Sequence, residues 1–206
     1  MQPINPGGVP PEAIGLTDHV TYELGNITEI VKTKGHRAHP RDSVGVVGHV
    51  RAVLYGPDGE IKQIEEGSNL VTDYGDEHVG ERLHDDTALI VTGMRLGTGV
   101  TAAAKAGAGA AIVTYILTSQ EALDAVASGA DKGAGLGWRI THVCTWIAGD
   151  ITNGAIAETV LTDETPITDV AGVVGDTVAR FVFAATIDKQ AGDSLVVTWQ
   201  LDYLGA

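Results

Sequence analysis

The stretch Ser194–Leu204, SLVVTWQLDYL, determines the fold class of this chain. From position 195 to position 203 every second residue is large and apolar, and the residues between them are polar except for Val196. Because strand side chains point alternately to two faces, this pattern predicts a strand with one face on a core. The other face is open to water or a partner, as is typical of antiparallel sheets. The apolar positions are Leu195, Val197, Trp199, Leu201 and Tyr203.

Similar segments outward from this strand predict more strands. Residues 45–55, GVVGHVRAVLY, are rich in β-branched side chains and run into a Gly-Pro-Asp-Gly turn at 56–59. This arrangement predicts a hairpin with residues 60–66. Further strands are expected over residues 89–96, 138–147, 155–161 and 177–187, and Trp138 and Trp199 are expected in the core. The predicted fold is mainly β, an antiparallel β-sandwich with one or two short helices and an extended N-terminal arm.

The two short helices are predicted from their start signals. Thr72 is a plausible N-cap for a helix that ends near Leu83. Thr118 followed by Glu121 has the spacing of a capping box and predicts a second helix that Gly129 stops.

Composition limits the classes of function. The chain of 206 residues has 27 acidic and 13 basic side chains, and its formal net charge is −14. This balance opposes binding to phosphate backbones, which requires clustered Lys and Arg. The single cysteine, Cys144, excludes an internal disulfide. No stretch is long and apolar enough for a membrane span, and the N-terminus lacks a signal-peptide pattern, so we expect synthesis and use without secretion.

The first 44 residues differ from the rest and predict two domains, an N-terminal arm over 1–44 and a β-sandwich over 45–206. Four prolines and two glycines within residues 1–11 oppose regular structure. Two interpretations stay open: a disordered tail, and an arm that orders on a neighbouring subunit. The second is favoured by spaced aliphatic residues and by the basic cluster at 32–41. Its predicted partner-binding residues are Ile4, Val9, Pro10, Pro11, Ile14, Leu16, Lys32, Lys34, Arg37 and Arg41.

Candidate chemistry is sparse. A metal site at His36, His39 and His49 lacks the spacing of known zinc motifs. His142 and Cys144 share one strand face, which is compatible with a nucleophile pair but more typical of packing. The acidic loop with Asp163, Glu164, Asp169 and Asp176 lacks the regular spacing of a calcium loop. The glycine-rich segments 97–99 and 107–109 match no phosphate-binding motif. We therefore expect no enzyme activity, no cofactor and no metal.

The order of motifs resembles small virion proteins of tailed bacteriophages, which are capsid decoration (cement) proteins or components of head and tail fibres. The resemblance covers roughly residues 68–206. Its motifs are Asn69-Leu70-Val71-Thr72-Asp73-x-Gly75, Leu96-Gly97-Thr98-Gly99, Gly135-x-Gly137-Trp138-Arg139-Ile140-Thr141, Thr145-Trp146-x-Ala148-Gly149-Asp150, Ile156-Ala157-Glu158, Ala179-Arg180-Phe181-Val182-Phe183 and Asp193-Ser194-Leu195-Val196-Val197-Thr198-Trp199.

The resemblance implies an all-β sandwich that packs against other virion subunits, often as a homo-oligomer on a capsid axis, and it carries no catalytic residues. The main hypothesis is a capsid decoration protein that stabilises a phage head by bridging major capsid subunits. A trimer is favoured, made in the host bacterial cytoplasm and placed on the outer capsid surface, without direct contact to nucleic acid or membrane. The alternatives are a tail, baseplate or head-fibre component and a glycan-binding module.

Overall fold

The computed structural model describes residues 22–24, 27–29, 45–84, 89–132, 137–165 and 167–204. The chain divides into two compact units, Met1–Ser43 with Ala206, and Val44–Gly205. In the first unit, β1 (Tyr22–Leu24) and β2 (Ile27–Glu29) pair as an antiparallel hairpin. The predicted partner-binding residues of the arm, together with His36 and His39, lie outside the described residues, so their roles stay predictions.

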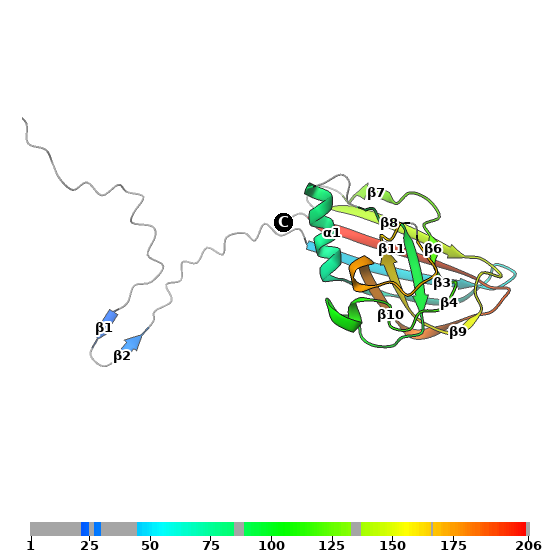
Figure 1. Cartoon of the computed structure of the whole chain (residues 1–206), viewed down its shortest axis with the longest axis horizontal. Coiled ribbons are helices and arrows are strands. Elements are labelled where there is room, and N and C mark those ends of the chain that lie inside the picture. Colours follow the sequence, from blue (N-terminus) through cyan, green and yellow to red (C-terminus); the bar gives the residue numbers. More distant parts are fainter. Residues whose placement is uncertain are drawn as a thin grey trace, which may run out of the picture. The chain divides into compact units, whose positions relative to one another are not determined.

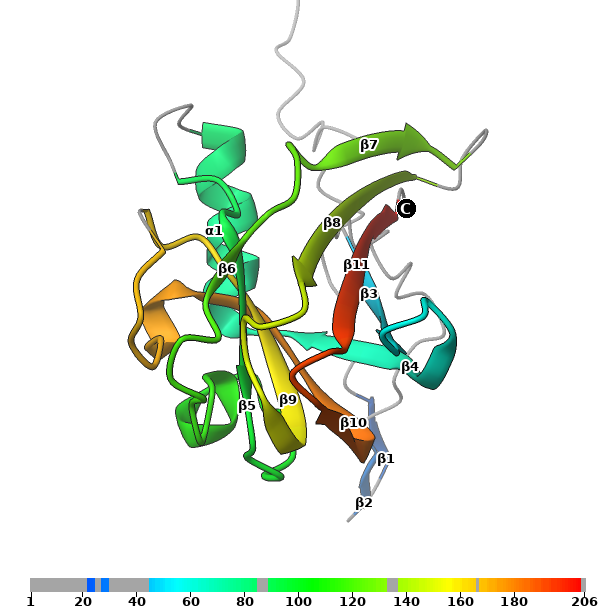
Figure 2. The ribbon, with the colours of Figure 1, turned by 90° about the vertical axis from the view of Figure 1, so that its right-hand side faces the viewer.

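The second unit is built on one nine-stranded sheet in which every pair of neighbours is antiparallel. The strand order is β6-β5-β9-β10-β4-β3-β11-β8-β7 (Figures 1 and 2). The prediction of a mainly β, antiparallel fold is confirmed. The bounds are β3 (Gly45–Tyr55), β4 (Ile61–Val71), β5 (Gly93–Gly97), β6 (Glu121–Ala122), β7 (Ser128–Asp131), β8 (Trp138–Trp146), β9 (Asn153–Thr162), β10 (Thr177–Lys189) and β11 (Ser194–Leu204).

Strand β11, whose alternating pattern predicted the fold class, lies between β3 and β8. Leu195, Val197, Trp199 and Leu201 are all buried, and Tyr203 packs partly buried against the same core. The polar residues between them lie on the half-buried opposite face. The alternation in the sequence therefore predicted both the strand and its buried face.

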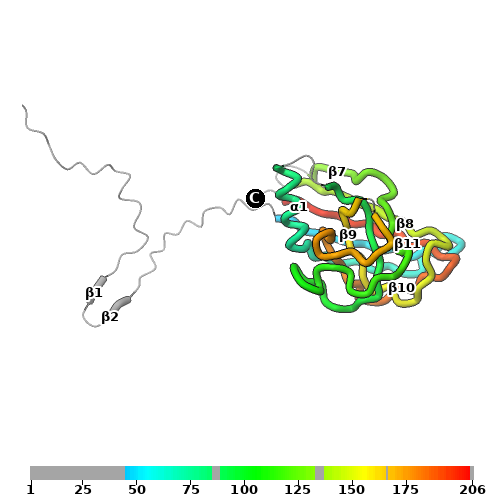
Figure 3. The backbone as a smooth tube through the Cα atoms, viewed as in Figure 1, coloured from blue at the N-terminus to red at the C-terminus, as the bar shows by residue number. Residues whose placement is uncertain are grey.

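The sheet curls around this core. In Figure 2, β4 lies between the group β5, β9 and β10 and the group β3, β11 and β8, and Figure 3 traces the same backbone as a tube. Strand β4 links the two halves of the sheet, because residues up to Asn69 pair with β3 while Leu70 and Val71 pair with β10. At one end of the strand order, the amide of Asp124, just after β6, donates to the carbonyl of Val143 in β8 (2.9 Å). The strands β3 to β11 of the second unit thus form one continuous curled sheet, and the predicted separation into two sandwich layers is not confirmed.

The first predicted helix is confirmed as α1 (Asp73–His84). The hydroxyl of Thr72 accepts a hydrogen bond from the amide of Gly75 (2.9 Å), as an N-cap does. The same hydroxyl donates to the carbonyl of Thr177 (2.5 Å), so the cap also ties the helix to β10. None of the described helices is long and apolar enough to cross a membrane.

The second predicted helix, from Thr118 to Gly129, is wrong. Thr118 has a backbone φ of 64°, and its amide donates to the Asp169 carboxylate. Glu121 pairs with Met94 of β5 as part of β6, and Leu123 donates its amide to the carbonyl of Thr92. Hydrogen bonds to β5 and β8 therefore outweigh the local capping preference. The other described helices are short 3-10 turns, η2 (Gly107–Ala110) and η3 (Val174–Asp176).

The expectation that both Trp138 and Trp199 are buried is half correct. Trp199 is fully buried, whereas 49% of Trp138 is exposed. Trp138 is the first residue of β8, and its indole lies against Gly129 of the edge strand β7, where few elements remain to cover it.

Candidate functional site

A largely apolar cavity of about 870 Å³ opens beside α1. Its walls come from α1, residues 90–92, residues 123–129 and the inward face of β8, and the elements around it are labelled in Figure 2. Large apolar side chains at its mouth are well exposed, and among them are Leu83, Ile90, Val126 and Trp138. Because accessible apolar side chains line this described cavity, it is the first candidate for binding.

Two histidines line this cavity, His78 from α1 and His142 from β8. The Nδ1 atom of His78 lies 3.0 Å from a carboxylate oxygen of the buried Asp163, and the Tyr74 hydroxyl donates to the same oxygen (2.7 Å). His142 is 5% exposed, and its Nδ1 atom has no hydrogen-bond partner in the described structure. Burial, and secondarily the nearby His78, lower the pKa of His142 to about 4. His142 is therefore neutral near pH 7.

His142 and Cys144 do share the inward face of β8, as predicted, and both are buried. The Cys144 thiol lies 3.4 Å from the carbonyl oxygen of Ala122 and 3.5 Å from that of Glu121. Burial raises the pKa of Cys144, with smaller contributions from Asp124 and Glu121. A thiol held in its protonated form is a poor nucleophile, so the pair fits the packing interpretation.

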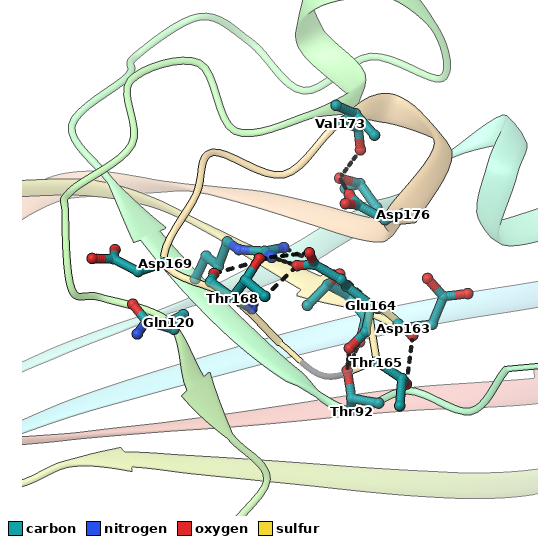
Figure 4. Close-up of polar contacts among 12 residues, drawn as sticks. Thr92, Gln120, Asp163, Glu164, Thr165, Thr168, Asp169, Val173 and Asp176 are labelled. Carbon is teal, nitrogen blue, oxygen red and sulfur yellow. Dashed lines mark hydrogen bonds and ion pairs between the residues drawn. The ribbon is translucent and has the colours of Figure 1, made fainter.

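The carboxylates of the acidic loop, residues 163–176, bind side chains and amides within the loop and in neighbouring segments (Figure 4). Glu164 forms an ion pair with buried Arg95 and accepts a hydrogen bond from the Thr168 hydroxyl (2.7 Å). Asp169 accepts hydrogen bonds from the Tyr115 hydroxyl (2.7 Å) and the Thr118 amide (2.6 Å). Within the residues that the structure describes, no group of three or more His, Cys, Asp or Glu side chains could hold a metal ion.

A buried ion pair between Glu158 of β9 and Arg180 of β10 anchors the glycine-rich loops. The Arg180 guanidinium donates to the Glu158 carboxylate at 2.7 and 2.9 Å and also to the carbonyls of Thr101 and Gly109. Glu158 accepts further hydrogen bonds from the amides of Gly99, Val113 and Thr114. These loops are therefore fixed by charge-assisted bonds and are not phosphate cradles.

Sequence reasoning did not predict this ion pair. The available signal was a charged residue inside each of two strongly apolar strands, AIAETVL and ARFVF. Charged side chains are almost never fully buried unless they are paired, so two such residues in buried strands indicate each other.

Comparison with known protein families, curated proteins and solved structures gave no match. Function is therefore argued from the geometry above and from the order of motifs in the sequence.

Proposed function

We propose that this chain is a structural protein of a tailed-phage virion, a capsid decoration protein that stabilises the head by bridging major capsid subunits. The order of motifs over residues 68–206 supports this proposal. Motif residues serve the folding of the domain: Thr72 caps α1, Trp146 and Trp199 fill the core, and Glu158 with Arg180 anchors loops. In this proposal the two halves of the curled sheet act as the sandwich layers that the resemblance implies.

The observation that carries the proposal is that buried charged side chains bind the loops of the domain. Arg180 and Arg95 are fully buried, and each binds a carboxylate and a loop carbonyl. Lys189 is also fully buried, and its ammonium donates to the carbonyls of Ile147 and Ile151 at 3.0 and 3.1 Å. Loops held in this way keep their shape under load, which is what a protein that cements a shell requires.

The proposal assigns attachment to the arm over residues 1–44 and support to the domain over residues 45–206. Apolar arm residues order along a groove between neighbouring capsid subunits, and the basic cluster contacts an acidic seam. Exposed ion pairs are individually weak and screened by salt, so the aliphatic residues supply most of the affinity. The assembly is a homo-oligomer, with a trimer favoured, on the outer capsid surface.

The experiment compares the full chain with a chain that begins at Arg41 in binding to expanded phage heads. The shortened chain should keep its melting transition and lose most of its binding. Two full-length variants separate the contributions of the arm. Replacement of Ile4, Val9, Ile14 and Leu16 by Ser should abolish stable binding, whereas replacement of Lys32, Lys34, Arg37 and Arg41 by Gln should mainly slow association. If the shortened chain binds as well as the full chain, the arm has no role in attachment.

A further inference from the structure

The cavity beside α1 has the volume and composition of a small-molecule site. Pockets for small ligands occupy roughly 300–1,000 Å³ and are lined mostly by apolar side chains, with a few polar groups that orient the ligand. This cavity measures about 870 Å³, and most of its described lining residues are apolar. A ligand with a long apolar part therefore matches the cavity, and the polar lining groups determine which head group it carries.

His142 is a buried polar residue of this lining whose ring lacks a hydrogen-bond partner among the described residues. It is more than nine-tenths buried, and its Nδ1 atom is fully enclosed without a partner. The Nε2 atom is not fully enclosed, so it is the ring nitrogen that a ligand in the cavity can reach. The ring is neutral near pH 7, so Nε2 donates or accepts according to the tautomer. A ligand group able to do either gives this buried ring the partner that it lacks.

His78 lines the cavity near His142 and offers a second ring nitrogen. Its Nδ1 atom lies 3.0 Å from a carboxylate oxygen of Asp163. A carboxylate only accepts hydrogen bonds, so Nδ1 carries the hydrogen, and Nε2 of the neutral ring is then an acceptor. A hydroxyl group both donates and accepts, so it suits His78 and either tautomer of His142.

A charged head group has no free counter-ion among the described lining residues. None of these residues is Asp or Glu, so an ammonium group would lose its hydration without gaining a carboxylate partner. Arg82, which carries a permanent charge in the lining, already has an interaction partner, and neutral His142 offers no positive charge to a carboxylate. The lining therefore favours a neutral head group over either ion.

We propose that this cavity binds a neutral aliphatic alcohol, with its chain along the apolar lining and its hydroxyl group toward His78 and His142. The exposed side chains of Leu83, Ile90 and Val126 contact the chain at the mouth of the cavity. This site goes beyond the proposed structural function and does not depend on it.

The test titrates the full chain with n-decanol and with its isomer methyl nonyl ether, which contains the same atoms but no hydroxyl hydrogen. Decanoate and decylammonium serve as the charged probes. Trp138 lies in the cavity wall and is half exposed, whereas Trp146 and Trp199 are fully buried, so a change in tryptophan emission reports on this cavity. We expect saturable binding of n-decanol with a one-to-one stoichiometry by calorimetry. Each of the other three probes should bind about tenfold more weakly, as expected for the loss of one hydrogen bond to a buried group.

Three variants locate the site. Trp138→Phe should keep the binding of n-decanol by calorimetry and lose the change in emission. His142→Phe keeps an aromatic ring and removes both ring nitrogens, so the alcohol and the ether should then bind within about twofold of each other. His49 is an exposed residue outside the described lining, so His49→Phe is the matched control and should keep the preference for the alcohol.

Several results would overturn the proposal. These are the absence of saturable n-decanol binding, equal affinity of the unaltered chain for the alcohol and the ether, tighter binding of either ion, and binding of many probe molecules. A change in emission that persists in Trp138→Phe would place the alcohol outside this cavity and would also overturn it. The comparison of the four probes on the unaltered chain decides the head group even if His142→Phe fails to fold.

Discussion

The two tryptophans that the sequence placed in the core differ in what surrounds them. Trp199 is fully buried between β3 and β8, whereas Trp138 stands half exposed at the start of β8. Replacing a buried aromatic side chain by Ala typically costs about 3–5 kcal/mol of unfolding free energy. We predict a loss in this range for Trp199→Ala and a clearly smaller loss for Trp138→Ala, measured by urea unfolding. Equal losses in the two variants would contradict the placement of these residues.

His142 predicts a pH dependence of stability. Its pKa of about 4 in the folded chain lies below its ordinary value of 6.5, so between these values the unfolded chain binds a proton that the folded chain does not. Stability is therefore lost as the pH falls through this window. From pH 7 to pH 5 the contribution of this residue is about 2 kcal/mol.

We expect His142→Gln to flatten the stability profile between pH 7 and pH 5, as measured by urea unfolding at several pH values. His49 lies on an exposed position of β3, so His49→Gln is the matched control and should leave the profile unchanged. An unchanged slope in His142→Gln would show that His142 is not held neutral by burial.

At the scale of elements, α1 contains two glycines with opposite roles. A Cβ at Gly75 would lie 2.1 Å from the carbonyl oxygen of Val178, so this glycine lets the helix approach β10. A Cβ at Gly80 would meet nothing within 4 Å. Ala is favoured over Gly by about 1 kcal/mol inside a helix when no contact opposes it.

Gly80→Ala should therefore raise the unfolding free energy by up to about 1 kcal/mol, and Gly75→Ala should lower it despite the better helix propensity. Thermal melts of the two variants decide this point. If both substitutions stabilise the domain, the close approach of α1 to β10 is wrong.

The buried pair of Glu158 and Arg180 should stabilise both the domain and the loops that it binds. Glu158→Gln removes the charge that neutralises buried Arg180, and loss of one partner of a buried pair costs about 3–5 kcal/mol. The exposed pair of Arg51 and Glu66, with a separation of 3.6 Å, provides the control. Glu66→Gln should cost no more than about 1 kcal/mol. Hydrogen exchange should also show faster exchange at the amides of Gly99, Val113 and Thr114 only in Glu158→Gln.

The sequence predicted those elements that depend on interactions between residues close together in the chain. The alternation in β11, the hairpin turn at 56–59 and the Thr72 cap depend on neighbours in the sequence, and all three were predicted correctly. The segment after Thr118 was wrong, because its amides and carbonyls pair with strands far away in the chain. The shared face of His142 and Cys144 followed from strand periodicity. The cavity and the ion pair did not, since they depend on how the sheet curls.

At the scale of the whole molecule, an acidic β domain with loops anchored by buried charged side chains follows an N-terminal arm. We propose that this arm binds neighbouring capsid subunits. The sequence predicted the β class of the domain because alternation is visible in several strands. It did not distinguish one curled sheet from two stacked sheets, since both bury the same alternating positions. The proposed role of the arm is a property of the assembled particle, so its test uses intact particles.

The proposal that this chain coats a phage head is tested most directly by a cryo-EM map of virions collected from cells that express the chain. The account predicts density for the nine-stranded domain at symmetry-related positions on the outer capsid surface. It also predicts that residues 1–44 follow a groove between neighbouring major capsid subunits. A map that places the domain on the tail, or virions that lack the protein altogether, would contradict the account.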